Sequence, residues 1–400
     1  MIDIYVKELL RGTAALFLHP LSYLFIVLAF VIGVKRVKRE RKEFKVKVHP
    51  VIDNLLQSFF PGLLVGLLFS VVLFAAGVVV PMGMIALIGV MYALLALTMK
   101  TRFLNPAYAI GLATVAAFIV PQDAATGVTL LDEWMRDIRN TPIDTLAILM
   151  ALLVLQEGVL IVWKGASRTS PRLFKGKRGQ FVGAHEATRL WLVPQFLLIP
   201  GGELPVGHSW PYIGLQAVSY SIMLVPFAIG FRQLNTHSLP KEAIKATGKQ
   251  VISLGVLLAI ITAVGFLTNL PLLAVVAIIG GTVGRELITM INSQRDDNGR
   301  PFFTRRNNGL VVLGVVPSTP ASKMGIAVGE IVIKANGKSL KNERDFYTAL
   351  QINAAYCKLE VLDHKGEVRF VQRSLYENEH HELGLLFVHE LVQKRSSEVS

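Results

Sequence analysis

Cysteine and charged residues are scarce in this 400-residue chain. The single cysteine, Cys357, excludes an intrachain disulfide framework and a cysteine-based zinc site, and it is typical of a domain kept in a reducing compartment. Only 17% of the residues are charged, whereas 52% are apolar. This composition is typical of a membrane protein and excludes a soluble secreted enzyme.

The motifs of common enzymes are missing as well. The sequence has no Gly-x-Ser-x-Gly nucleophile turn and no Gly-x-x-x-x-Gly-Lys-Ser/Thr phosphate loop. The nearest approach to a zinc-protease motif is His-Glu-Ala-Thr-Arg at 185–189, where Arg189 occupies the second ligand position and would repel a zinc ion. We therefore predict that the protein is not an enzyme and needs no metal or cofactor.

Apolar runs long enough to cross a ~30 Å hydrocarbon core as helices dominate residues 1–291. Eight runs are clear: 14–34, 61–80, 82–99, 103–120, 143–163, 212–231, 251–267 and 272–291. A ninth candidate, 190–199, is shorter and contains Pro194, so a short crossing, a re-entrant segment and a surface helix stay open for it. The pattern predicts a polytopic α-helical membrane domain with eight or nine spans.

Positive charge is distributed unevenly over the loops if the ninth candidate crosses. One side then receives twenty-one Lys and Arg residues, and the other receives four, namely Lys7, Arg11, Arg136 and Arg139. Because cytoplasmic loops carry the excess of Lys and Arg, this distribution favours nine crossings, an N-terminus outside and a cytoplasmic C-terminal domain. It also accounts for the net charge of +13 without a nucleic-acid partner.

A basic run at 35–47 follows the first span. Its candidate lipid-facing residues are Lys35, Arg36, Lys38, Arg39, Arg41 and Lys42. Each such charge attracts anionic lipid head groups by about 1 kcal/mol near the surface. Every polytopic protein also needs basic loops to fix its topology, so both interpretations stay open.

Glu157 is the one acidic residue deep inside a predicted span, where such a group marks an ion path or a buried partner. Since the chain shows no internal repeat of the kind found in transporters, we expect a packing or hydrogen-bonding role. The pairs Gly62/Gly66 and Gly280/Gly284 have the spacing that lets helices approach closely. Intrachain packing and homo-oligomerisation explain them equally well.

A domain of different character follows a polar linker at 292–306. Strands are expected at 309–316, 330–334, 357–362, 368–374 and 383–389, with a short helix ending at Gly325 and a helix at 342–351 capped by Asn342. This pattern predicts an α+β domain at 307–395 and a polar tail at 396–400. Cys357 is expected in its core as an inert residue.

The domain resembles bacterial PDZ domains. The similarity is carried by Leu-Gly-Val-Val-Pro-Ser-Thr-Pro-Ala at 313–321, Met-Gly-Ile at 324–326, Gly-Glu-Ile-Val at 329–332 and Ala-Asn-Gly-Lys at 335–338. Gly-Glu at 329–330 departs from the family's usual Gly-Asp. The resemblance implies a partly open β-barrel or sandwich with a groove that binds the C-terminus of a partner peptide.

The resemblance also implies the residues of this groove. The segment 382–387 is similar to the carboxylate-binding loop and final strand of permuted bacterial PDZ domains. Backbone N–H groups of Leu383, Gly384, Leu385 and Leu386 would then bind a peptide carboxylate, and the helix with Phe346 and Leu350 would wall the groove. A groove that binds nothing, and docking by another face, remain alternatives.

The whole chain resembles the MinJ family of membrane adaptors. The similarity rests on Phe-Leu-His-Pro at 17–20, Gly33 with the basic run after it, many spans and one terminal PDZ domain. It implies a non-enzymatic scaffold of bacterial division-site selection that bridges DivIVA and the MinCD inhibitor, MinD included, at septa and poles. A membrane transporter and a PDZ-bearing regulator of proteolysis are the alternatives.

Overall fold

The computed structural model describes residues 2–121, 126–176, 179–205, 213–214, 219–306, 308–353, 355–375 and 383–388. Several residues used in the sequence predictions lie outside the described residues, namely Lys177, Arg178, Tyr212, Glu382 and the tail at 396–400.

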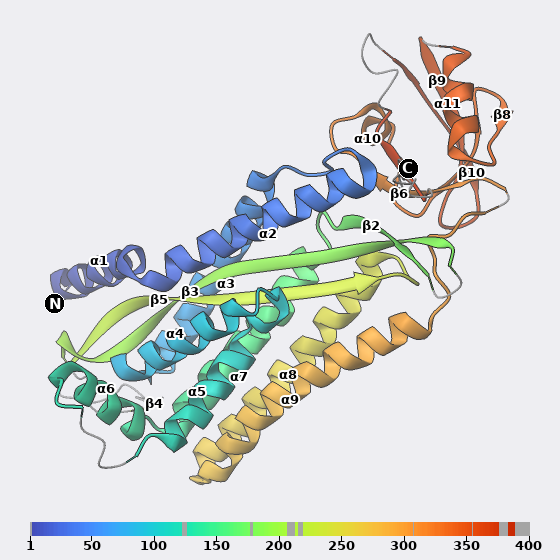
Figure 1. Cartoon of the computed structure of the whole chain (residues 1–400). Coiled ribbons are helices and arrows are strands. Elements are labelled where there is room, and N and C mark those ends of the chain that lie inside the picture. Colours follow the sequence, from blue (N-terminus) through green and yellow to red (C-terminus); the bar gives the residue numbers. More distant parts are fainter. Residues whose placement is uncertain are drawn as a thin grey trace, which may run out of the picture.

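Long helices form most of the membrane part (Figure 1). They are α1 (Ile2–Leu18), α2 (Pro20–Phe44), α3 (Val51–Ala75), α4 (Met82–Leu97), the 3-10 turn η1 (Thr101–Phe103), α5 (Pro106–Ile119), α6 (Thr129–Asn140), α7 (Ile143–Leu160) with the π-helical turn η2 (Ile161–Gly165), α8 (Pro240–Thr268) and α9 (Pro271–Asn298). Among the described residues, five helices are long and apolar enough to cross a membrane: α2, α3, α7 with η2, α8 and α9. The protein is therefore a multipass membrane protein.

Helices occupy seven of the predicted spans, with shifted boundaries. The run at 14–34 is divided where His19 caps α2, because its ring Nδ1 accepts a hydrogen bond from the N–H of Leu21 at 3.3 Å and Pro20 follows in the first turn. The helix expected from residue 61 begins at Val51 and contains Pro61. The helices α4 and α5 are apolar but shorter than a full span.

The predicted helical span at 212–231 is wrong, and the candidate at 190–199 is neither a helical crossing nor a surface helix. Residues 190–199 belong to β3 (Phe181–Pro205), and the described part of 212–231 belongs to β4 (Ile213–Gly214) and β5 (Ser219–Asn235). Strands β3 and β5 form a long antiparallel hairpin, with His185 opposite Asn235 near the open end and Pro205 opposite Ser219 near the turn. Both strands are buried on both faces over most of their length, so their apolar residues run on without the alternation that identifies a strand.

The backbone groups at the edges of this hairpin find partners among its neighbours. Strand β3 also pairs with β2 (Ser170–Lys175) and β1 (Val78–Val79). The hydroxyl of Tyr92 donates to the carbonyl of Ala228 at 2.9 Å, Ser70 accepts from the N–H of Phe196 at 2.9 Å, and the N–H of Gly230 donates to the carbonyl of Leu104 at 2.6 Å. Non-helical backbone is tolerated within a membrane protein under this condition, namely when protein covers it.

Glycines bring the helices onto the hairpin. A Cβ added at Gly62 of α3 would lie 2.2 Å from the carbonyl oxygen of Leu192, and one at Gly66 would lie 2.5 Å from that of Pro194. On α9, a Cβ at Gly284 would lie 2.9 Å from Leu254 of α8. Gly62, Gly66 and Gly284 therefore serve packing within the chain, whereas a Cβ at Gly280 would make only an ordinary contact of 3.8 Å, and the pair on α3 contacts a strand rather than a helix.

Glu157 has a buried partner. Its carboxylate, fully buried on α7, accepts a hydrogen bond at 2.8 Å from Nε of Arg285 on α9, which is 4% exposed and also donates to the hydroxyl of Thr289. This ion pair agrees with the expected hydrogen-bonding role and removes the observation that favoured an ion path.

The C-terminal domain is an antiparallel sheet with two helices. Its elements are β6 (Leu310–Val315), α10 (Pro320–Lys323), β7 (Ile331–Ala335), β8 (Lys338–Ser339), α11 (Glu343–Gln351), β9 (Tyr356–Leu362), β10 (Val368–Ser374) and β11 (Leu385–Phe387). The sheet has the order β10-β9-β7-β6-β11, and β8 pairs with β7. Asn342 caps α11 in a capping box with Asp345, as expected. Cys357 is buried in the core, and burial raises the pKa of its thiol to about 12, so it is inert.

This domain is docked on one end of the membrane part (Figure 1). His185 of β3 bonds through Nε2 to the carbonyl of Leu313 on β6 at 2.7 Å, and the N–H of Gly183 donates to the carbonyl of Phe303 at 2.8 Å. An apolar cluster that includes Phe44, Leu173, Phe303, Leu313 and Leu386 fills the junction. Helix α2 ends and helix α8 begins at this same end of the molecule.

Candidate functional site

Among the residues that the structure describes, strand β11 is one edge of the C-terminal sheet, and β10 is the other. Strand β11 pairs only with β6 in the described sheet, with Leu385 opposite Val315 and Leu386 opposite Gly314. The N–H of Val316 donates to the carbonyl of Gly384 at 2.8 Å, beside the Leu385 and Val315 pair. In this antiparallel pattern the N–H and C=O of Leu385 point away from β6, toward the open edge. An extended peptide can therefore pair with β11.

The loop that precedes β11 is held in a conformation that requires glycine. Gly384 has a φ of +85°, and a Cβ at this position would lie 2.1 Å from the hydroxyl oxygen of Thr319. The carbonyl of Leu383 accepts a hydrogen bond from the N–H of Ala321 at 3.0 Å, and Thr319 donates to the carbonyl of Val316 at 2.6 Å. These contacts fasten the loop to the segment between β6 and α10 and so fix its backbone.

Helix α11 faces this edge across a groove of about 560 Å³. Phe346, Tyr347 and Glu343 line the groove from α11, and Phe346 packs edge-on against Phe387 with ring centroids 5.1 Å apart. The four loop and strand residues predicted for the site, Leu383, Gly384, Leu385 and Leu386, line it from the other side. Leu350, also predicted for the groove, lies instead in the apolar core of the domain.

The third wall of the groove comes from the membrane part, which the sequence did not reveal. Helix α2 ends at Phe44, and Lys45 follows in the left-handed region with a φ of +62°, so that the chain turns sharply there. Arg41, Phe44, Lys45, Val46 and Lys47 line the groove from this side. Phe44 is buried against Leu386, whereas Arg41, Lys45 and Lys47 are exposed. Nothing in the sequence pattern connects residues 41–47 with residues 383–387.

The six residues proposed to face lipid fall into two groups. Lys35, Lys38, Arg41 and Lys42 are exposed. Arg36 is buried, lies 3.6 Å from Glu40 and donates to the carbonyls of His49 and Pro50, and Arg39 pairs with Glu186 and donates to Ser170. These two side chains lie on the face of α2 that packs against the protein, where Arg36 meets the loop at 49–50 and Arg39 meets β2 and β3.

Glu186 is the centre of an ionic network at the open end of the hairpin. Its carboxylate bonds Arg39, Arg172 at 2.9 Å and Arg232 at 2.6 Å. Burial alone would raise the pKa of Glu186, but Arg39, Arg232 and Arg172 outweigh burial and hold this pKa below its usual range. The segment 185–189 is thus a structural strand, and it lacks the helical geometry of a zinc-protease motif.

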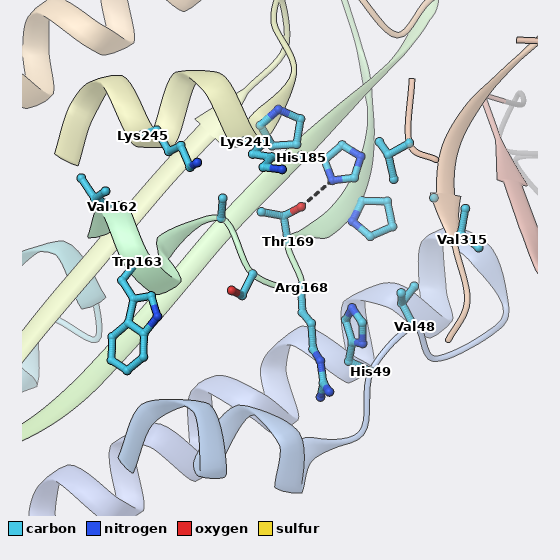
Figure 2. A pocket seen from close by; sticks show the side chains of 16 residues that line it. Val48, His49, Val162, Trp163, Arg168, Thr169, His185, Lys241, Lys245 and Val315 are labelled. Atoms are coloured by element: carbon cyan, nitrogen blue, oxygen red, sulfur yellow. Dashed lines mark hydrogen bonds between the residues drawn. The ribbon is translucent and has the colours of Figure 1, made fainter. Parts of the chain in front are cut away.

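A second cavity, of about 690 Å³, lies at the junction between the two parts (Figure 2). Lys241 and Lys245 of α8 lie on one side of it, Val48 and His49 on another, and Val315 of β6 belongs to its wall. Thr169 bonds Nδ1 of His185 at 2.9 Å. Burial lowers the pKa of His185 to about 4, and burial together with nearby Arg36, Arg168 and Arg189 lowers that of His49 to about 3. Both imidazoles are therefore neutral at pH 7.

The fold and the site define a multipass membrane protein with a small antiparallel β-domain that carries an open-edged groove. The chain is 38% identical over 383 residues to the cell division topological determinant MinJ of Bacillus subtilis (strain 168), covering 95% of each sequence. It is 27% identical over 391 residues to the probable MinJ proteins of Lacticaseibacillus paracasei and Lacticaseibacillus casei (strain BD-II), covering 93% of this chain and 97% of each relative. The chain belongs to the MinJ family of cell division topological determinants, as the sequence resemblance indicated.

No family model matches the chain, and no solved structure matches it.

Proposed function

We propose that the protein is a non-enzymatic membrane scaffold of division-site selection, and that its C-terminal PDZ domain binds the C-terminal peptide of a division protein. The observation that carries this proposal is the open edge of β11 beside α11, with the glycine loop at Leu383 and Gly384 at its start. A peptide adds to such an edge through backbone hydrogen bonds, and its side chains enter the groove.

The terminal carboxylate of the peptide is proposed to lie at the loop that begins β11. N–H groups of Leu383, Gly384, Leu385 and Leu386 are the candidate donors, of which that of Leu385 points to the open edge. The left-handed backbone of Gly384 turns successive amides toward one anion. Phe346 and Tyr347 then contact the peptide side chains from α11.

The domain is proposed to lie in the cytoplasm, with the N-terminus outside. The basic residues of 35–47 lie at and just after the C-terminal end of α2, those of 164–172 lie between η2 and β2, and those of 241–249 lie at the start of α8, all near the end of the molecule where the domain is docked. The β3–β5 hairpin leaves this end and returns to it, so it replaces two helical crossings without changing the sidedness of the loops. The excess of Lys and Arg at this end supports the cytoplasmic assignment.

The membrane part confines the domain to two dimensions and so raises its effective concentration for partners on the membrane. By family resemblance, the proposed partners are DivIVA and the MinCD inhibitor, which the scaffold would bridge at septa and poles. The exposed Lys35, Lys38 and Lys42 are proposed to contact anionic head groups. Arg36, which pairs with Glu40, and Arg39, which pairs with Glu186, are instead suited to hold α2 in place.

Localisation tests the scaffold. A fluorescent protein that matures only in the cytoplasm is fused after Ser400 and expressed at native level in growing cells. Bands at septa and poles support the proposal, a dark fusion contradicts the topology, and an even membrane signal contradicts the division role. Deleting residues 307–400 should mislocalise the partners, while normal partner placement in those cells would refute recruitment by the domain.

A pair of glycine variants tests the groove. Gly384→Glu places a carboxylate where the peptide carboxylate is proposed to bind, and we expect at least tenfold weaker capture of a partner peptide. Gly366→Glu is the matched control, because Gly366 has the same φ of +85° but no atom within 4 Å of an added Cβ. Equal capture by both variants would move partner binding to another face of the domain.

A further inference from the structure

We infer that the groove selects C-terminal peptides that carry acidic residues just before their terminal carboxylate, and that the selecting residues belong to α2 rather than to the domain itself. This inference rests on the proposed function, because it assumes that a peptide binds along β11. It adds the chemical class of the partner.

Basic side chains outnumber acidic ones among the described residues that line the groove. Arg41, Lys45 and Lys47 line it and are exposed. Within the described part of the chain, no carboxylate forms an ion pair with any of these three side chains. Glu343 of α11 is the acidic residue that lines the groove. Among the residues of the groove walls that the structure describes, the basic side chains outnumber the acidic one by two, before the peptide's own carboxylate is considered.

The position of these cations is fixed by the fold. Phe44 is buried against Leu386, the neighbour of Leu385 on the open edge. The N–H of Lys45 donates to the carbonyl of Arg41 at 3.0 Å and closes the last turn of α2. Arg41, Lys45 and Lys47 are thus held around an anchored phenylalanine, where an incoming strand must pass. Acidic side chains on that strand gain favourable Coulomb energy, and basic ones lose it.

Because each cation is exposed, each contributes modestly, and together they should change affinity by roughly tenfold or more at low salt. This contribution should shrink as ionic strength rises, because the Debye length falls to about 3 Å at 1 M salt. The selectivity also requires the junction, since a domain detached from α2 lacks the third wall.

The test uses the full chain in nanodiscs of zwitterionic lipid and fluorescence anisotropy of synthetic decapeptides. All peptides share an apolar last residue, and the preceding residues include three glutamates, three glutamines or three lysines. A fourth peptide repeats the glutamate sequence with an amidated C-terminus. The protein is compared with the double variant Lys45→Glu/Lys47→Glu and with the control Lys35→Glu/Lys38→Glu, whose exposed lysines lie on the same helix but do not line the groove.

We expect the glutamate peptide to bind about tenfold or more tightly than the glutamine peptide, and high salt to remove the difference. The Lys45→Glu/Lys47→Glu variant should reverse the preference toward the lysine peptide, a gain that a misfolded protein cannot show. The control variant should keep the original preference. Equal affinity for the glutamate and glutamine peptides, or loss of preference in the control, would overturn the inference while leaving peptide binding intact. Undetectable binding of every peptide, or equal binding of the amidated one, would instead refute the proposed function.

Discussion

At the scale of single residues, one buried ion pair between α7 and α9 shows how the protein accommodates buried charge. Glu157 and Arg285 are both buried between α7 and α9, and each is tolerated because the other lies beside it. Breaking such a pair by removing one partner leaves an uncompensated charge, which costs more than the pair itself contributes. The pair of Arg102 and Glu286 lies 3.3 Å apart near the same helices and is partly exposed.

Glu157→Gln should therefore lower the free energy of unfolding of the detergent-solubilised protein by about 3–5 kcal/mol, and with it the melting temperature. Arg102→Gln is the control and should cost less than about 1 kcal/mol, because that pair is partly exposed. Combining Glu157→Gln with Arg285→Met should recover part of the loss, since no charge is then left unpaired. A melting temperature unchanged by Glu157→Gln would show that the pair has no structural role.

At the scale of elements, the β3–β5 hairpin is the feature around which the helices pack. Its strands carry apolar residues on both faces, and glycines on the helices allow a close approach to its backbone. Gly62 and Gly66 provide this approach on α3, and Gly12 provides it on α1, where an added Cβ would lie 2.4 Å from the carbonyl oxygen of Ile222.

Gly62→Ala should destabilise the membrane part by about 1–3 kcal/mol, because its Cβ would push against the backbone of Leu192. Gly280→Ala is the matched control on a spanning helix, since its nearest neighbour would be Leu258 at an ordinary 3.8 Å. The control should be neutral or stabilising, because alanine favours the helix. Thermal unfolding of the two variants, monitored through their aggregation, distinguishes them. Equal melting temperatures would contradict the close packing of α3 on the hairpin.

For the whole molecule, the junction decides how the domain is presented to its partners. His185 reaches from β3 to the carbonyl of Leu313, and it is buried and neutral. Its pKa is about 4 when the domain is docked and returns toward 6.5 when the junction opens. The open state then binds more protons between these two values, so the contribution of His185 to docking is complete above pH 6.5 and declines as the pH falls toward 4.

Acidification from pH 7 to pH 5 should therefore weaken the junction by about 2 kcal/mol through His185 alone. Hydrogen exchange of the amides in β6, measured at both pH values and corrected for intrinsic rates, should show the loss of protection. His185→Gln should remove most of this pH dependence, whereas His364→Gln, at an exposed turn of the domain, should preserve it. A pH profile unchanged by His185→Gln would assign the effect to other groups.

Most of the domain and many of the helices could be predicted from local sequence signals. Asn342 with Asp345, Asn336 with Gly337, and the alternating residues of β9 each determine their element through neighbouring residues alone. The hairpin could not be predicted in this way, because a strand buried on both faces resembles a buried helix. Pro194 and Pro226, which lie opposite one another in it, were the available signals against helices.

The sequence by itself determined that this chain enters a membrane several times, that its basic residues gather in particular loops, and that a small β-domain with a glycine loop ends the chain. These properties follow from composition, apolar run length and turn residues, which act over a few neighbouring positions. Only the tertiary structure decided that two apolar runs pair as strands, that Glu157 meets Arg285, and that Phe44 to Lys47 form a wall of the groove. Each of these depends on contacts between residues fourteen or more positions apart, and local patterns do not encode which distant partner completes a buried backbone, a buried charge or a groove.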